Sequence, residues 1–220
     1  MVKKKQKKSA ISRKQALETF ALLCELYPNP KTELVYDGPF QLLIAVILSA
    51  QCTDAQVNKA TPALFENFPT PQALMKAPLP KVEKLVHSCG FYRAKARAII
   101  KTATDLVEKF EGKIPDSLEE LTTLAGVGRK TASVVLNQAF DIPAIAVDTH
   151  VLRVSQRIGW AQSDTPEKVE MELRALLPEE LWGAVNGTLI LHGRKLCKAR
   201  KPLCEQCPIQ SECRFYMNNR

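Results

Sequence analysis

Apolar residues recur along the chain at the three- and four-residue spacing of amphipathic helices, and no stretch alternates apolar and polar positions over a strand's length. The pattern predicts a buried central helix at residues 40–50, where nearly every position is apolar, and a long basic amphipathic helix at residues 93–110. Shorter helices are expected at 53–66, 71–76, 81–88, 129–140, 148–158, 166–177 and 181–191. Capping boxes at Ser12 and Ser117 indicate two more helix starts. The sequence therefore predicts an all-α fold.

Composition and charge narrow the class of protein. The 220 residues suffice for one large or two small domains, and the net charge of +8 favours an anionic partner such as nucleic acid. The longest apolar run, Leu42–Leu48, is too short to span a bilayer, and no apolar signal segment follows the lysine-rich start. We therefore expect no membrane partner, and a disordered basic tail at residues 1–10.

A glycine turn joins two predicted helices within residues 118–140. Its tip, Gly126-Val127-Gly128, permits positive φ and the close approach of another backbone, and free N–H groups opening the next helix can hold a phosphate oxygen. This is the helix-hairpin-helix pattern of proteins that grip the DNA backbone without reading its sequence. A glycine-capped corner between two helices is the alternative, but Arg129 and Lys130 follow at once.

Lys130 and Asp148 are candidate catalytic residues. Lys130 falls in the first turn of a predicted helix, where the helix dipole and partial desolvation would lower its pKa and enlarge its nucleophilic fraction; a charged phosphate contact is an equal alternative. Asp148 precedes a predicted helix, so it can cap that helix and remain ionised, ready to stabilise a cationic sugar carbon or assist proton transfer. His150 nearby is more typical of a packing residue than of a catalyst.

Four of the seven cysteines crowd the C-terminal end with the spacing C-x6-C-x2-C-x5-C. Such uneven spacing is typical of an iron–sulfur cluster, and a [4Fe–4S] cubane is favoured. Zinc ranks second because zinc ribbons usually carry two C-x2-C pairs, and disulfides rank third because the odd cysteine count suits a reducing compartment. The candidate ligands are Cys197, Cys204, Cys207 and Cys213.

Together these segments resemble the endonuclease III family of helix-hairpin-helix DNA glycosylases. The resemblance covers about residues 32–213 and rests on the following segments: PFQLLIAVILSAQCTD from Pro39, LAGVGRKTASVVL from Leu124, AIAVDTH from Ala144, LILHGR from Leu189 and the cysteine loop. It implies two helical lobes with DNA in the cleft between them. One is a six-helix barrel lobe at residues 32–141 with the hairpin, and the other joins residues 11–31 to residues 142–220 with the cluster loop at 197–213.

The resemblance also implies a function in base excision repair. A bifunctional enzyme of this family flips an oxidised pyrimidine out of double-stranded DNA, and Lys130 would attack its C1′, expel the base and cleave the abasic site by β-elimination through a Schiff base. Asp148 would assist from the opposite wall. The DNA contacts implied are Gln51 in the gap left by the flipped nucleotide, Phe91 as a wedge, and Gly126, Val127, Gly128, Arg129, Thr131 and His150. Without the resemblance, Gln51 would be interpreted as a helix-end residue and Phe91 as a core residue.

Two departures from the family pattern stand out. Phe91 occupies a position that is commonly leucine, and Asn186-Gly187 occupies a place where members often have two histidines. A monofunctional adenine or thymine mismatch glycosylase is a competing prediction, although such enzymes typically lack the lysine. A DNA-binding module with a structural cluster and no chemistry is another. We expect a bacterial monomer in the cytoplasm, associated with the nucleoid.

Overall fold

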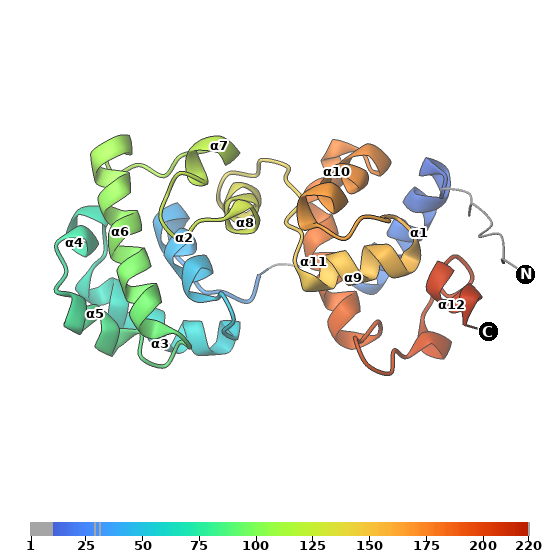
Figure 1. Cartoon of the computed structure of the whole chain (residues 1–220), viewed down its shortest axis with the longest axis horizontal. Helices are drawn as coiled ribbons and strands as arrows, with labels where there is room; N and C mark the ends of the chain where they lie inside the picture. Colours follow the sequence, from blue (N-terminus) through green and yellow to red (C-terminus); the bar gives the residue numbers. More distant parts are fainter. Residues whose placement is uncertain (1–10, 29, 31, 220) are drawn as a thin grey trace, which may run out of the picture. The chain divides into compact units, whose positions relative to one another are not determined.

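The computed structural model describes residues 11–28, 30 and 32–219, and within them every regular element is a helix (Figure 1). The predicted all-α class is confirmed. The chain divides into two compact units, one of residues 32–146 and one that joins residues 1–31 to residues 147–220. The sequence predicts that the second unit resumes at residue 142, whereas in the structure it resumes at residue 147. The predicted tail at residues 1–10 lies outside the described residues. Among the described helices, none has the length and apolar character needed to cross a membrane.

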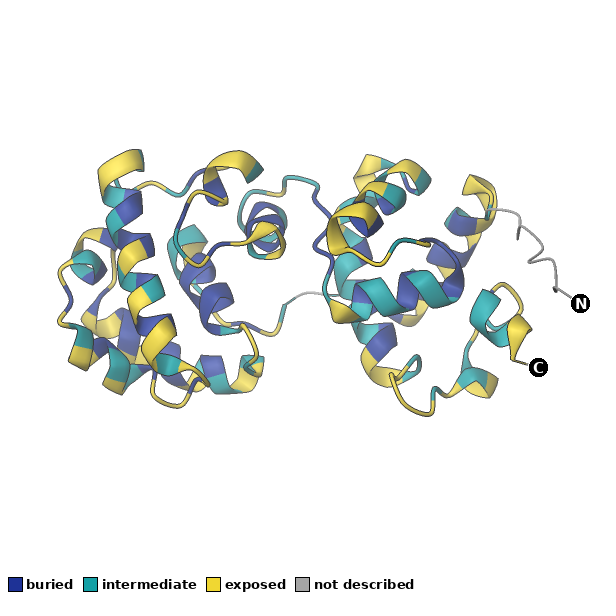
Figure 2. Ribbon diagram, in the orientation of Figure 1, coloured by how far each residue is buried: buried dark blue, intermediate teal, exposed yellow. Residues whose placement is uncertain are grey.

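The unit of residues 32–146 is organised around α2 (Gly38–Leu48). Residues 42–48 of this helix are all buried, and α3, α6 and α8 pack against it (Figure 2). The long helix α6 also packs against α4 and α5. The remaining bounds are α3 (Asp54–Asn67), α4 (Pro71–Met75), α5 (Leu79–Leu85), α6 (Tyr92–Phe110), α7 (Leu118–Leu121) and α8 (Arg129–Ala139).

The limits of α2 differ from those predicted. The helix begins two residues early because Pro39 fits its first turn, where no backbone N–H is required. It ends at Leu48 with Ser49 as the C-cap, so Ala50 and Gln51 lie beyond it. The Ser117 capping box is only half formed, since the Glu120 carboxylate accepts a hydrogen bond from the Ser117 hydroxyl at 3.0 Å rather than from its backbone N–H.

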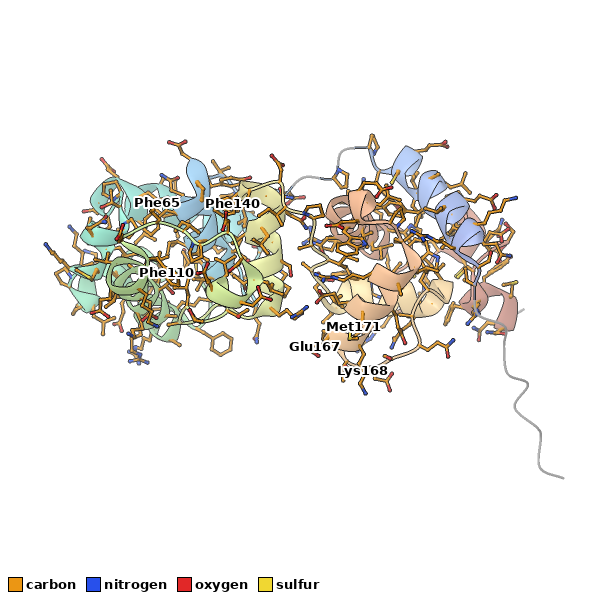
Figure 3. All side chains as sticks on the ribbon, turned by 90° about the horizontal axis from the view of Figure 1, so that it is seen from above. Phe65, Phe110, Phe140, Glu167, Lys168 and Met171 are labelled. Carbon is orange, nitrogen blue, oxygen red and sulfur yellow. The ribbon has the colours of Figure 1, made fainter. Side chains whose placement is uncertain are left out.

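The second unit contains α1 (Arg13–Leu26), α9 (Thr149–Ile158), α10 (Pro166–Leu176), α11 (Trp182–Lys195) and α12 (Arg214–Asn218), with 3₁₀ turns at Glu179–Leu181 and Cys204–Gln206. Helix α11 packs against α1 and α9, and α12 packs against α9. The Ser12 capping box of α1 is confirmed. Glu167, Lys168 and Met171 extend outward from α10 (Figure 3), in keeping with the 68% exposure of Met171.

The glycine turn between α7 and α8 is held by two buried side chains of α6. Thr102 donates a hydrogen bond to the carbonyl of Ala125 at 2.5 Å, and the carboxylate of Asp105 accepts one from the Ala125 N–H at 3.3 Å. Side chains of α6 therefore satisfy both the N–H and the carbonyl of Ala125, the residue just before the glycine turn. These hydrogen bonds fix the turn relative to the core.

Asp105 is buried, and hydrogen bonds to its carboxylate compensate for the lost solvation of its charge. Burial alone would raise its pKa, but hydrogen bonds from Lys101, Lys109 and the Ala125 N–H outweigh that effect and hold the pKa below the usual value. The Asp105 carboxylate lies 2.8 Å from the Lys101 ammonium and 3.3 Å from that of Lys109. The carboxylate therefore stabilises the fold only in its charged form.

We predict that Asp105→Asn lowers the free energy of unfolding by about 1–3 kcal/mol at pH 7, because it removes the charge that pairs with Lys101 and Lys109 and replaces one of the two accepting oxygens with an NH₂ donor. The difference from wild type should be fully present above about pH 5 and shrink as the pH falls below about 3.9 and through the lower folded-state pKa, where the wild-type carboxyl also loses its charge. Urea unfolding across this pH range measures it. Glu108→Gln, an exposed change on the same helix, should stay within about 0.5 kcal/mol at every pH. A deficit independent of pH would contradict the electrostatic explanation.

Candidate functional site

The two glycines of the turn have different roles. Gly126 has a φ of +75°, and a Cβ there would lie 3.2 Å from the Cβ of Ala98, so the position requires glycine. Gly128 has an ordinary φ of −88°, and a Cβ there would meet no other atom within 4 Å, so only Gly126 uses the positive φ that glycine permits. Between them Val127 is buried in the core. Because Gly128 has no side chain, the space around the start of α8 is open.

Helix α8 begins without a side-chain cap, because its N-cap residue is Gly128. The first N–H groups of a helix have no intrahelical acceptor, and together with the helix dipole they form a site for an anion. Lys130 lies in this first turn and is exposed, as is Arg129, while Thr131 is half-buried. Lys130 is therefore accessible from solvent.

Gln51 and Phe91 lie on two segments that touch. A Cβ on Gly90 would be 3.7 Å from the carbonyl oxygen of Gln51, and the thiols of Cys52 and Cys89 are in hydrogen-bond contact. Gln51 and Phe91 both have left-handed backbones, with φ of 52° and 58°. Phe91 is 70% exposed, so its interpretation as a core residue is wrong. Two strained residues, one of them an exposed aromatic, are thus presented on adjoining segments of one unit.

Asp148 caps α9, in the other unit. Its carboxylate accepts hydrogen bonds from the N–H groups of His150 and Val151, both at 2.8 Å, so the predicted N-cap is confirmed and the side chain is held in one orientation. Burial lowers the pKa of His150; Asp148 partly opposes this effect, and Arg153 adds to it. The Arg153 guanidinium donates to His150 Nδ1 at 3.1 Å. His150 is therefore a neutral imidazole whose second nitrogen, Nε2, carries the proton.

Close packing on α11 explains one departure from the family pattern. A Cβ at Gly187 would lie 2.5 Å from the carbonyl oxygen of Pro30. The backbone at Pro30 can therefore pack against α11 at this position only if the residue there is glycine. Gly193, further along the same helix, similarly leaves room for His150 and Arg153, whose atoms would lie 2.8 and 3.0 Å from a Cβ there. The absence of a histidine at position 187 thus has a packing cause.

The four C-terminal cysteines line one pocket. The empty space in and at the mouth of the pocket is about 360 Å³, open solvent included, and its other walls include Ile158, Leu203 and Phe215. All four cysteines have free thiols, and Cys213 is the most buried of them. In the part of the chain that the structure describes, no three His, Cys, Asp or Glu side chains are placed to hold a single metal ion. Ligands of a [4Fe–4S] cluster each bind a different iron, so four separated sulfurs around one pocket fit a cluster better than zinc.

Electrostatics also favour a multiply charged occupant. Burial raises the pKa of Cys207 to about 11, and the neighbouring cysteines contribute to the rise. Burial and the same neighbours raise the pKa of Cys204 and Cys213. Because these thiols repel one another as anions, all four can be thiolates together only around a cationic centre such as the irons of a cluster.

Two arginines of α9 brace the cysteine loop. Arg153 donates to the carbonyls of Cys197 and Gly193 at 3.2 and 3.1 Å, so the arginine that contacts His150 also holds the first candidate ligand. Arg157 donates to the Lys198 and Ala199 carbonyls at 2.7 and 3.0 Å and lies 3.5 Å from the Cys197 sulfur. The sequence analysis did not predict that Arg153 and Arg157 contact the cysteine loop. Their four-residue spacing, which puts both on one face of the predicted helix at 148–158, was the available signal.

A third neighbour of the loop was also missed. His192 lies in the segment LILHGR, but its local sequence gives no sign of a role. Its side chain is 1% exposed, and its two ring nitrogens approach Tyr27 and Cys207. Burial lowers the pKa of His192 to about 4, and burial together with the nearby cysteines raises the pKa of Tyr27 to about 12. Both side chains are therefore neutral at physiological pH.

Comparison with known families agrees with the fold and the site. Residues 44–179 match the model of the HhH-GPD superfamily of base excision DNA repair proteins, and residues 197–213 match the iron–sulfur binding domain of endonuclease III. The class that the helical fold and the glycine hairpin define is thus the helix-hairpin-helix DNA repair glycosylases.

Sequence similarity to individual proteins identifies the family within this class of glycosylases. The chain is 46% identical over 208 residues to endonuclease III of Synechocystis, covering 94% of this chain and 95% of the relative. It is 49% identical over 178 residues to that of Thermotoga maritima (81% and 84%), and 44% identical over 205 residues to that of Escherichia coli (93% and 97%). The chain belongs to the endonuclease III family, and it is a DNA glycosylase and abasic-site lyase with a [4Fe–4S] cofactor.

Solved structures agree. A trapped endonuclease III–DNA covalent intermediate, in an estranged-adenine complex, matches with a TM-score of 0.90 at 44% identity, covering 95% of this chain and 99% of that one. A non-covalent endonuclease III–DNA complex matches with a TM-score of 0.89 at 44% identity, covering 95% and 98%. DNA is therefore the partner class of this fold.

We predict that Cys213→Ser, which removes the most buried of the four thiols, lowers the bound iron well below the roughly four atoms per chain expected of wild type. The broad visible absorbance of an iron–sulfur protein should fall in proportion. Iron, sulfide and zinc analysis of the purified proteins measures this. Cys24→Ser, which changes a cysteine of α1 outside the loop, should keep its iron. A wild-type protein that is colourless and holds stoichiometric zinc would contradict the assignment.

Proposed function

We propose that this enzyme removes oxidised pyrimidines from double-stranded DNA and cleaves the resulting abasic site by β-elimination. The observation that carries the proposal is the exposed Lys130 in the first turn of α8, directly after the uncapped Gly128. The turn offers an anion site for a DNA phosphate, and the amine beside it is accessible to a nucleotide held there. The similarity to a trapped DNA covalent intermediate supports covalent chemistry on this fold.

In the proposed reaction the neutral amine of Lys130 attacks C1′ of the flipped nucleotide and the base departs. A proton from the attacking amine goes with the departing base. The C1′–O4′ bond then breaks, O4′ takes up a proton, and a protonated imine joins lysine and sugar. Removal of a C2′ proton breaks the C3′–O bond, so the strand is cut 3′ to the lesion.

Asp148 stabilises the positive character that develops at the sugar as the base leaves. The two N–H groups that hold its carboxylate keep the charge in one place before substrate arrives. His150 borders the site as a neutral hydrogen-bond donor, fixed by Arg153. It serves to contact DNA and takes no part in proton transfer.

Gln51 and Phe91 act together on the duplex. Gln51 fills the space of the extruded nucleotide, while Phe91 wedges between bases, as apolar side chains do in proteins that unstack DNA. The contact of their segments across Gly90 and their fixed, left-handed backbones support a joint role. The glycine turn, with Arg129 and Thr131, binds the phosphate backbone without reading sequence.

Cys197, Cys204, Cys207 and Cys213 are the proposed ligands of the cluster, which holds the basic loop between them in shape. The enzyme is proposed to act as a monomer. Its bacterial relatives support a place in the cytoplasm at the nucleoid, where its DNA substrate lies.

Borohydride trapping tests the nucleophile. Abasic-site DNA incubated with wild-type protein and NaBH₄ should give a covalent adduct, and Lys130→Gln should abolish it because an amide forms no imine with the sugar. Lys113→Gln, which changes another lysine of the same unit, should trap like wild type. Equal trapping by Lys130→Gln would show that another amine reacts.

Asp148→Asn separates base removal from strand cleavage in the same assay. Asparagine is also a good N-cap, so the helix start is preserved. Base release from oxidised-pyrimidine DNA should slow by about 10²-fold or more, while the imine with a preformed abasic site should still be trapped. Base release at the wild-type rate would show that the Asp148 charge does not act on the sugar.

Gly128→Ser tests the anion site at the start of α8. Serine at this N-cap, whose backbone is already extended, should cap the helix and raise the free energy of unfolding by roughly 0.3 kcal/mol. The same oxygen occupies the N–H groups needed by a phosphate, so DNA binding should weaken by roughly tenfold at fixed salt. Thermal unfolding and fluorescence anisotropy with abasic-site DNA measure the two effects. A stabilised variant that binds DNA as tightly as wild type would show that α8 does not hold a phosphate.

A further inference from the structure

His192 joins helix α1 to the cysteine loop by two polar contacts. Its Nε2 lies 3.6 Å from the sulfur of Cys207, and its Nδ1 lies 3.3 Å from the hydroxyl oxygen of Tyr27. The Tyr27 and His192 rings also meet edge to face, with centroids 5.9 Å apart and planes at 68°. Tyr27 is 4% exposed and His192 is 1% exposed, so water does not compete for these contacts.

The two contacts determine which ring nitrogen carries the proton. A buried, neutral imidazole has one N–H, and the hydrogen bond at one nitrogen decides the state of the other. If the Tyr27 hydroxyl donates to Nδ1, the proton is on Nε2 and points at Cys207. The opposite tautomer would direct the Nε2 lone pair at a sulfur that is anionic when it binds iron, which is repulsive. The arrangement with Nε2–H toward sulfur is therefore the stable one.

We propose that Tyr27 and His192 form a hydrogen-bond relay that donates the Nε2–H to the cluster-bound sulfur of Cys207 and raises the reduction potential of the cluster. The inference rests on the proposed role of Cys207 as a ligand. A donor to a cysteine sulfur stabilises the more negative, reduced cluster over the oxidised one, so it makes reduction easier. His192 acts directly on the ligand, and Tyr27 is a positioning residue that holds the tautomer.

The relay can be changed without dismantling the loop. Arg157 also approaches a ligand sulfur, but it supports two loop carbonyls and stacks on Phe215 at 4.6 Å, so its removal would disturb the whole segment. Tyr27→Phe deletes a single hydroxyl and keeps the ring packing. Tyr36→Phe is a matched control, because it deletes a hydroxyl that makes a 3.3 Å hydrogen bond to Gln138, in the unit without the cluster.

The experiment measures the midpoint potential of the intact, cluster-loaded protein by a redox titration followed by electron paramagnetic resonance. His192→Leu should shift the potential to more negative values, and Tyr27→Phe should shift it part of the way in the same direction. His192→Gln, which keeps an amide donor, should recover part of the loss. Tyr36→Phe should leave the potential at the wild-type value. Iron content and thermal midpoint are measured on every variant so that only fully loaded samples are compared.

A second measurement uses the wild type and does not depend on any variant folding. The chain has three histidines, so ¹⁵N-histidine labelling is selective. A hydrogen bond from Nε2 to the cluster sulfur should produce a weak ¹⁵N coupling to the paramagnetic cluster in pulsed spectra, and Tyr27→Phe should alter it.

Unchanged potentials in loaded Tyr27→Phe and His192→Leu, or no ¹⁵N coupling in wild type, overturn the relay. If His192→Leu does not load its cluster, the coupling and the Tyr27→Phe potential decide. Borohydride trapping by Lys130 is unaffected by either result, so failure of the relay and failure of the proposed lyase chemistry are distinguishable. Cys207→Ser protein that keeps a full cluster would instead remove the ligand assignment beneath the relay.

Discussion

The proposed function of this chain depends on the N-terminus of α8, which has no side-chain cap. Every helix start must find acceptors for its first N–H groups, and several starts here use a side chain, such as Ser12, Thr53 or Thr70. Helix α8 uses Gly128 and has no such cap. Thr102 and Asp105 of α6 anchor the turn that precedes α8, so this helix start is held in place by the core of its unit. The proposed phosphate site is therefore ordered before a ligand binds.

In the second unit, the first N–H groups of α9 have a side-chain acceptor, unlike those of α8. Helix α9 is capped by Asp148, whose carboxylate takes two N–H groups and is thereby fixed in direction. An open N-terminus suits the binding of an anion, whereas a capped one presents a negative charge of the protein's own. The first would attract a DNA phosphate, and the second would face the cationic sugar that base loss creates. Two helix starts with opposite electrostatic character thus supply the two requirements of the proposed reaction.

Local sequence signals predicted these features well because each depends on a few adjacent residues. The glycine turn, the position of Lys130 in a first turn, the Asp148 cap and the buried α2 could all be inferred from short segments. The relay of Tyr27 and His192 could not, because its members are 165 positions apart and meet only after α1 packs on α11. The role of Gly187 was hidden for the same reason, since its neighbour Pro30 is remote in sequence. Without the family resemblance Phe91 would have been placed in the core, because apolar character alone does not distinguish an internal aromatic residue from an exposed one.

Phe91 and Gln51 show how such an exposed site is maintained. A non-glycine residue with positive φ costs on the order of 1–3 kcal/mol and persists only where its surroundings fix it. Here the surroundings are the end of α2, the start of α6 and the contact of Gly90 with the Gln51 carbonyl. Exposing 70% of a phenylalanine adds a further unfavourable term, because its apolar surface remains in water. Neither term stabilises the unit of residues 32–146 itself. The cost of exposure is offset only when something apolar and stackable covers Phe91, and an unstacked base step of DNA, its proposed partner, has that surface.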